Sequence, residues 1–382
     1  MTADAIPFPH SGARRISAAV VAVLALVAAL LTTAAPAHAD NSVVEMPALV
    51  PGGPDYQQKL KDEVGFWNLS KMAKAALNNE DHDAVAPSGG WDAYSKPWPV
   101  RQGLIGRTAG KLLMEYKNLD TGATELSACS GDVVTSANKS VVITAGHCVG
   151  YHLPVVGPNL FVDNMVFIPG FNGAGLARHT DSTALPGKDV APYGVWGVTR
   201  EWTTDTWAHN GDWAAGGDMA ALLVANPDDP RPIAEVTGGQ KIAFNQPRAQ
   251  HSVLFGYPTS NERNYYSHAQ NKVAAPLQRD YDGRTLMYAE GDAWSDPVYY
   301  NDVITGAMAP GSSGGPWLQN FDPATGEGVQ TGAFSRYDDP GQIIGIQGWL
   351  IGPNLQATQF GDEEQAVYFA AQSVNRQPVN RA

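Results

Sequence analysis

Basic residues are scarce in this sequence of 382 residues. It contains 25 Lys and Arg against 38 Asp and Glu, and its formal net charge is −13. Proteins that bind nucleic acid or anionic membranes neutralise phosphates with an excess of Lys and Arg. The acidic balance therefore argues against both partners, and it remains after Arg14, Arg15 and Asp4 are removed with the N-terminal segment described next.

Long hydrophobic runs are also lacking, apart from one near the N-terminus. Residues 16–31 are apolar except for Ser17, follow Arg14 and Arg15, and precede Ala37-His38-Ala39. The run is shorter than the roughly 20 residues that a membrane span needs, and an A-x-A site follows it as in a secretory signal peptide. We expect residues 1–39 to be removed, a mature start near Asp40, a secreted extracellular protein and no membrane contact afterwards.

Cysteine is nearly absent, since the chain has only Cys129 and Cys148. An even count in an exported chain predicts one disulfide, and two buried free thiols are the alternative. Charged residues make up only 16% of the chain, whereas it has 40 Gly, 27 Pro, 14 Tyr and 10 Trp. This composition is typical of a β-rich fold with many turns, and about 340 mature residues exceed one ordinary domain.

Residues 40–105 differ from the rest of the chain. They contain a helical pattern over 55–79 and a polar, turn-forming stretch over 78–90, so we interpret them as a pro-segment or an attached extension. Short strand patterns follow, which predicts an all-β sandwich or barrel in two halves, one over 106–232 and one over 233–382. The expected strands are 111–116, 130–136, 140–144, 161–169, 219–224, 253–257, 286–290, 317–318, 330–335 and 343–350, with a closing helix over 362–375.

Two motifs carry the chemistry. The first is Thr144-Ala145-Gly146-His147-Cys148, and the second is Gly311-Ser312-Ser313-Gly314-Gly315-Pro316. A histidine can activate a serine hydroxyl, and glycines beside the serine let backbone N–H groups face a developing oxyanion. The second motif also fits the G-x-S-x-G elbow, but that fold needs a histidine after the serine. The last histidine is His268, which precedes the serine motif. The elbow fold is therefore excluded, and a histidine that activates the serine must come before it in the chain.

These motifs resemble those of the chymotrypsin-like serine proteases, most closely the secreted bacterial branch that includes the glutamyl endopeptidases. The resemblance covers about residues 107–370. Further matching segments are Cys129-Ser130-Gly131, Asp218-Met219-Ala220-Ala221-Leu222-Leu223-Val224, Phe255-Gly256-Tyr257-Pro258 and Gly332-Ala333-Phe334-Ser335. The resemblance implies two antiparallel six-stranded β-barrels with the site between them.

The resemblance also implies roles for individual residues. Ser313 would be the nucleophile, His147 the base and Asp218 the acid that orients it, with Asp212 as the competing acid. The backbone N–H groups of Gly311 and Ser313 would form the oxyanion hole. We therefore expect a secreted serine endopeptidase that cleaves protein or peptide substrates as a monomer through an acyl-enzyme, without cofactor or metal. A secreted esterase with the same triad and a non-catalytic homologue that binds proteins are the alternatives.

The expected specificity pocket is uncharged. The family position six residues before the nucleophile is Ala307, with Met308 beside it, and Phe334 and Ser335 lie on the strand that lines the cleft. No carboxylate is available there for Lys or Arg, and Phe334 stands immediately before Ser335, where the glutamyl endopeptidases have a histidine that binds Glu. Because an unpaired charge is costly to bury, the residues predict cleavage after an uncharged, apolar side chain.

Overall fold

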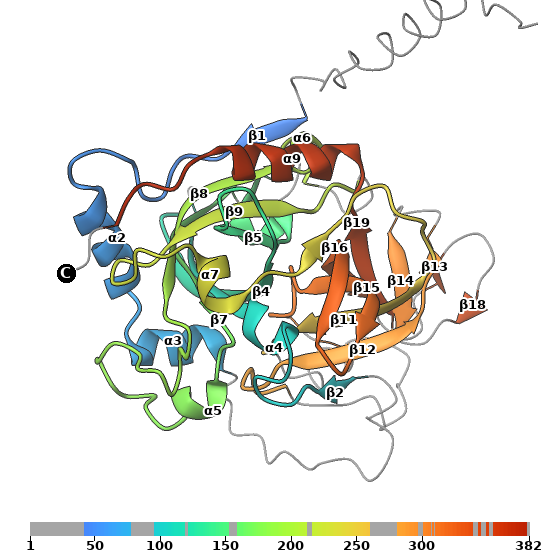
Figure 1. Ribbon diagram of the computed structural model, residues 1–382, viewed down its shortest axis with the longest axis horizontal. Coiled ribbons are helices and arrows are strands. Elements are labelled where there is room, and N and C mark those ends of the chain that lie inside the picture. The colour runs from blue at the N-terminus through green and yellow to red at the C-terminus, as the bar shows by residue number, and fades with distance from the viewer. Residues whose placement is uncertain are drawn as a thin grey trace, which may run out of the picture. The chain divides into compact units, whose positions relative to one another are not determined.

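The computed structural model describes most of the chain after residue 41. Nearly all of its strands are antiparallel and belong to two sheets, which Figure 1 shows beside each other, one around β4 and β5 and one around β15 and β16. The described residues are 42–77, 95–118, 121–152, 159–211, 216–259, 281–296, 301–306, 308, 310–338, 343–344, 349–350 and 354–379.

The first sheet closes into a six-stranded barrel. Its strands pair in the order β8-β9-β5-β4-β3-β7, and a further pairing between β7 and β8 completes the ring. The strands are β3 (Ala109–Asn118), β4 (Thr124–Val133), β5 (Val141–Thr144), β7 (Asn159–Pro169), β8 (Trp196–Thr204) and β9 (Ala220–Ala225).

Both faces of these strands are apolar, because one face lines the interior of the barrel and the other is covered from outside. Alternate side chains such as Leu112, Val142 and Leu222 fill the interior of the barrel. The intervening ones, such as Ile143 and Leu223, point outward but are covered by other segments of the chain. Successive side chains on a strand point to opposite faces, so a strand covered on both sides becomes a continuous apolar run.

The second sheet follows the same plan. β11 pairs with both β12 and β15, and β12 leads through Ala293 into β13, which pairs with β14. The series of neighbouring strands therefore comes back to where it began, and it encloses a core that includes Leu254, Ile304 and Trp317. The strands are β11 (His251–Gly256), β12 (Met287–Asp292), β13 (Trp294–Ser295), β14 (Asp302–Thr305), β15 (Pro316–Asp322), β16 (Glu327–Asp338) and β19 (Asn354–Gln359). The all-β prediction with two barrels is confirmed.

The segment before the first barrel packs against both barrels. β1 (Val43–Glu45) pairs with β8 of the first barrel, and β2 (Lys96–Pro97) pairs with β12 of the second. α2 (Tyr56–Gly65) and α3 (Leu69–Ala76) lie against the first barrel, and the α3 side chains join its outer core beside Leu113 and Val166. The boundaries 40–105, 106–232 and 233–382 stay predictions, and so do both interpretations of residues 40–105, as a pro-segment or as an attached extension.

The helix expected over 55–79 is two helices. Asn68 has an extended backbone and its side chain caps α3 by accepting a hydrogen bond from the Lys71 N–H. Trp67, which is fully buried, donates its indole N–H to the Asn164 carbonyl at 2.6 Å. Asn is a preferred N-cap, so a second helix begins where the sequence pattern alone suggested continuation.

The C-terminal helix α9 (Asp362–Ser373) follows the second barrel in sequence but covers the first (Figure 1). Its Val367 and Ala371 belong to the same buried cluster as Ile143 and Trp202, and the Tyr368 hydroxyl donates to the Thr135 carbonyl at 2.7 Å. The predicted helix over 362–375 is thereby confirmed. The remaining elements are α4 (Ile105–Thr108), η2 (Gly146–Val149), β6 (Tyr151–His152), α5 (Gly173–Leu176), α6 (Asp205–Asn210), α7 (Ile233–Thr237), β10 (Lys241–Ile242), β17 (Ile343–Ile344) and β18 (Trp349–Leu350).

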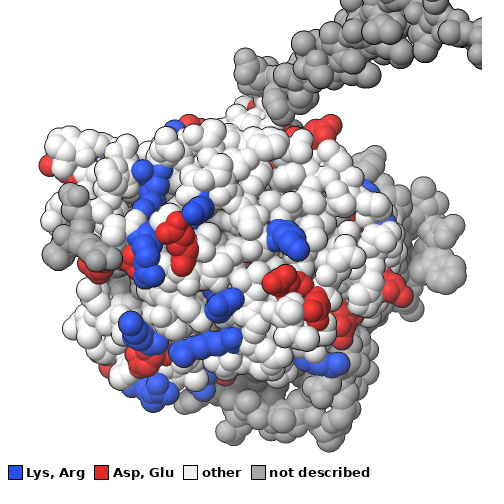
Figure 2. Space-filling view, in the orientation of Figure 1, with Lys and Arg blue, Asp and Glu red and all other residues white. Residues whose placement is uncertain are grey.

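The surface of the described part carries few charges. Figure 2 shows one face on which basic and acidic side chains lie in small groups on a largely uncharged surface. Within the described ranges, no helix combines the length and hydrophobicity that crossing a membrane would require.

Candidate active site

His147 lies on η2, directly after β5. It is the one residue between Ser140 and Gly150 that is not buried, and 15% of its side chain is exposed. Its backbone N–H donates to Asp218 Oδ1 at 2.8 Å, and its carbonyl accepts from the Tyr116 hydroxyl at 3.0 Å. The ring lies 6.1 Å from that of Trp207. Both the backbone and the imidazole are therefore held in place while one edge reaches the surface.

Asp218 lies two residues before β9 and is 1% exposed. Its carboxylate accepts from three donors, which are the His147 N–H, His147 Nδ1 at 3.0 Å from Oδ2, and the Ser335 hydroxyl at 2.7 Å from Oδ2. A carboxylate facing Nδ1 fixes the proton on that nitrogen and leaves Nε2 with its lone pair. The competitor Asp212 lies outside the described residues.

Ser313 lies in a glycine-rich loop before β15. It is the one residue between Gly311 and Gln319 that is not buried. Gly314 has φ +78°, and a Cβ there would lie 2.0 Å from Thr144 Oγ1 and 2.6 Å from the Ala145 nitrogen. This close approach requires glycine. It seats the loop that carries Ser313 on the segment leading to His147.

The loop also leaves backbone donors available. Among the described residues, the N–H groups of Gly311, Ser312 and Ser313 donate no hydrogen bond, whereas those of Gly314 and Gly315 do. Buried N–H groups are normally paired, so such groups beside a partly exposed serine are suited to bind an oxyanion.

The predicted disulfide between Cys129 and Cys148 is present and links β4 to η2. It places a covalent tie one residue after His147. In the described part of the chain, one group of metal-type donors gathers closely, made of His147 and these two cysteines. A disulfide offers no thiolate to a metal, so this group does not suit one.

The four predicted pocket residues have different environments. Ala307 lies outside the described residues. Met308 and Phe334 are buried in the core of the second barrel. Ser335 instead contacts Asp218, at a point where the register between β16 and β19 is irregular. Such irregularities re-aim side chains, which the sequence pattern could not reveal.

A buried lysine lies behind the serine loop. Lys111 on β3 is fully buried, and its amine donates to the Tyr257 carbonyl of the second barrel at 2.9 Å. Burial lowers the pKa of Lys111 well below its usual value, and Asp282 opposes this shift. The sequence did not predict this contact, because its partner Tyr257 lies 146 residues away in the other barrel.

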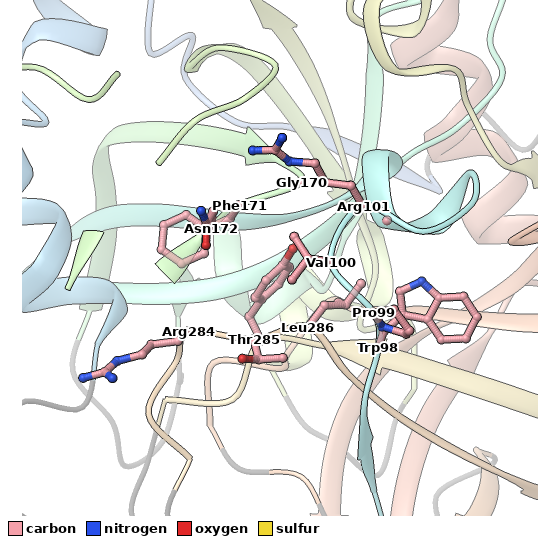
Figure 3. Close-up of a pocket in the computed structure, with 12 residues that line it drawn as sticks. Trp98, Pro99, Val100, Arg101, Gly170, Phe171, Asn172, Arg284, Thr285 and Leu286 are labelled. Carbon is pink, nitrogen blue, oxygen red and sulfur yellow. The ribbon is translucent and has the colours of Figure 1, made fainter. Parts of the chain in front are cut away.

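A separate pocket is lined by residues from both halves of the chain. Figure 3 shows Trp98, Arg101, Phe171 and Arg284 around it, drawn from segments before β3, after β7 and before β12. None of the predicted catalytic, oxyanion-hole or pocket residues lines it.

Comparison with known proteins gives structural matches only. No protein-family model and no curated protein matches the sequence. Among solved structures, the chain is similar to the protease Anisep from Arthrobacter nicotinovorans, at 24% identity and a TM-score of 0.50, over 73% of this chain and 100% of that one. It is also similar to the thermostable serine protease AL20 from an extremophilic microorganism, at 26% identity and a TM-score of 0.49, over 71% and 100%.

A third match is a Glu endopeptidase, at 14% identity and a TM-score of 0.43, over 75% of this chain and 99% of that one. The likeness to Anisep bears on the fold, and it agrees with the two barrels described above. The resemblance indicated by the sequence motifs is confirmed at this level: the chain has the fold of the bacterial chymotrypsin-like serine proteases.

Proposed function

We propose that the protein is a secreted serine endopeptidase. The observation that carries the proposal is the pairing of His147 Nδ1 with Asp218 Oδ2 at 3.0 Å, beside a glycine loop that presents Ser313. The N-terminal signal pattern over residues 1–39 and the disulfide support an extracellular location.

In this proposal, Ser313 Oγ attacks the carbonyl carbon of a peptide bond while His147 Nε2 takes its proton. Asp218 keeps the other imidazole proton on Nδ1 and stabilises the imidazolium that forms. The negative charge on the carbonyl oxygen is received by the N–H groups of Gly311 and Ser313. His147 then returns the proton to the leaving amine, which leaves an ester on Ser313.

A water molecule completes the cycle. His147 takes a proton from the water, the hydroxide attacks the ester, and the proton passes to Ser313 as the acid product departs. These steps need no cofactor. The acidic net charge supports protein or peptide substrates over nucleic acid, and we propose that the protein acts as a monomer.

The test compares peptide and ester hydrolysis by the secreted protein and by Ser313→Ala. The proposal expects hydrolysis of both substrates by the native protein and a loss of about 10⁶ in turnover on substitution. Ester hydrolysis without any peptide hydrolysis would favour the esterase. A folded native protein that cleaves neither substrate would favour the non-catalytic homologue.

A further inference from the structure

The hydroxyl, the backbone N–H and the carbonyl of Ser130 all form hydrogen bonds where the two barrels meet. Ser130 lies on β4, next to Cys129 and opposite Lys111 on β3, and is 1% exposed. Its hydroxyl donates to the Gly311 carbonyl at 2.8 Å and accepts from the Tyr257 N–H at 2.9 Å. Its backbone N–H donates to the Ser313 carbonyl at 2.7 Å, and its carbonyl accepts from Thr144 Oγ1 at 2.8 Å.

These contacts bear on the peptide planes of the serine loop. The carbonyls of four successive loop residues are all engaged. Pro310 accepts from Thr259, Gly311 from the Ser130 hydroxyl, Ser312 from the Gly315 N–H, and Ser313 from the Ser130 N–H. A peptide is planar, and its C=O and N–H point in opposite directions. Fixing the four carbonyls therefore fixes where the N–H groups of the loop point.

Gly311 is the position where the loop could most easily change conformation. Its φ is +94°, and glycine tolerates many other backbone conformations. The contact on its carbonyl is the Ser130 hydroxyl, a single side-chain bond from the other barrel. Without that bond, the peptide after Gly311 can rotate and carry the N–H groups on either side out of alignment.

Tyr257 anchors the hydroxyl in turn. Its N–H donates to Ser130 Oγ, and its carbonyl accepts from Lys111 Nζ. Ser130 on β4 and Lys111 on β3 are therefore hydrogen-bonded to the peptide units before and after Tyr257, which directly follows β11. The direction of the Ser130 hydroxyl is set by this arrangement, because its lone pair faces Tyr257 and its proton faces Gly311.

We propose that Ser130 is a positioning residue for the reaction, whose hydroxyl holds the Gly311–Ser313 loop with its N–H groups directed at the substrate carbonyl. This inference rests on the proposed function. Ser130 does not touch the substrate in this account, and it acts through the loop.

The test uses the full secreted protein with Ser130→Ala and Ser130→Thr, which remove and retain the hydroxyl. Removing one oxyanion donor costs about 10²–10³ in turnover, so Ser130→Ala, which only loosens the loop, should lower kcat by about 10- to 100-fold with KM unchanged. A peptide boronate, which mimics the tetrahedral intermediate, should bind more weakly by the same factor. Ser130→Thr should restore most of both.

Ser252→Ala is the matched control. Its hydroxyl is also fully buried, but it donates to the Gln250 carbonyl near the start of its own strand and does not contact the loop. It should keep the native kcat and boronate affinity. A Ser130→Ala variant that is folded and retains both of these native values overturns the proposal. So does a loss that appears only in KM.

Amide hydrogen exchange gives a readout that does not depend on activity. In the native protein, the Tyr257 amide should exchange as slowly as its neighbours in β11, and in Ser130→Ala the hydrogen-bonded amides of Gly314 and Gly315 should exchange about tenfold faster. A Tyr257 amide that exchanges within seconds in the native protein overturns the inference. If exchange behaves as expected but the native protein cleaves no substrate, the proposed function has failed and the positioning of the loop has not.

Discussion

Two buried glutamates between the N-terminal segment and the first barrel make stability depend on pH. Glu63 on α2 is 7% exposed, and Glu201 on β8 is 1% exposed. Burial raises the pKa of Glu63 to about 8, because its carboxylate loses contact with water, and the charge of Asp163 adds to this. Burial also raises the pKa of Glu201 well above its usual value, and Glu63 reinforces the shift.

The sign of the effect follows from proton binding. Between the ordinary pKa of 4.5 and about 8, folded Glu63 holds a proton that the unfolded chain has released. The folded state binds more protons in this window, so the free energy of unfolding falls as the pH rises through it. From pH 5 to pH 8, the loss from Glu63 alone is on the order of 3 kcal/mol.

Replacing Glu63 with Gln removes this titration while keeping the size of the side chain. The difference in unfolding free energy between pH 5 and pH 8 should shrink by about 3 kcal/mol. Urea unfolding at both pH values measures it, with Ser313→Ala present in all samples to prevent self-digestion. Glu125→Gln, at an exposed position on β4, is the control and should leave the difference unchanged. If Glu63→Gln also leaves it unchanged, the reasoning is refuted.

Four other outcomes are expected. Asp218→Asn should keep the fold and lower turnover by about 10⁴ near neutral pH, because the imidazole takes the wrong tautomer; a mild loss in kinetic assays would contradict this. Ser335→Ala should lower kcat by about tenfold, since a hydrogen bond to a buried carboxylate is lost, and an unchanged kcat would refute the role. The unreduced, denatured protein should contain no alkylatable thiol, and reducing the disulfide should cost roughly 3 kcal/mol; finding two thiols by mass spectrometry would disprove it. Because α2 and α3 cover the barrel core, active protein should still contain peptides from 56–77, and active material without them would count against this.

Much of the architecture could be predicted from local patterns. The strands before His147 and after Asp218 are apolar runs, and most of the expected strands lie within a few residues of the observed ones. The barrel strands β8, β14 and β19 were not among those expected. β8 contains Arg200 and the buried Glu201, and β19 alternates buried polar residues with apolar ones. Gln356 in β19 is satisfied by a hydrogen bond from Asn301, 55 residues away, which no local pattern reveals.

In the candidate site, too, some residues could be predicted from the sequence and others could not. Residues that carry a motif were found from the sequence, and the structure brings His147 beside Asp218 and the Ser313 loop onto the segment before His147. The supporting contacts of Ser130 and Ser335 could not be inferred. Each depends on how the two barrels meet or on an irregular strand register, and both serines are common residue types without a distinctive spacing. The segment 343–350, expected as one strand, instead contains the paired β17 and β18.

The central claim is that Ser313 is a nucleophile activated by His147 and Asp218. Labelling the native secreted protein with a serine-directed fluorophosphonate, followed by peptide mapping, tests it most directly. The account predicts label on Ser313, unchanged labelling in Ser312→Ala and strongly slowed labelling in Asp218→Asn. Label recovered on Ser312, or a folded native protein that takes up no label, would contradict it.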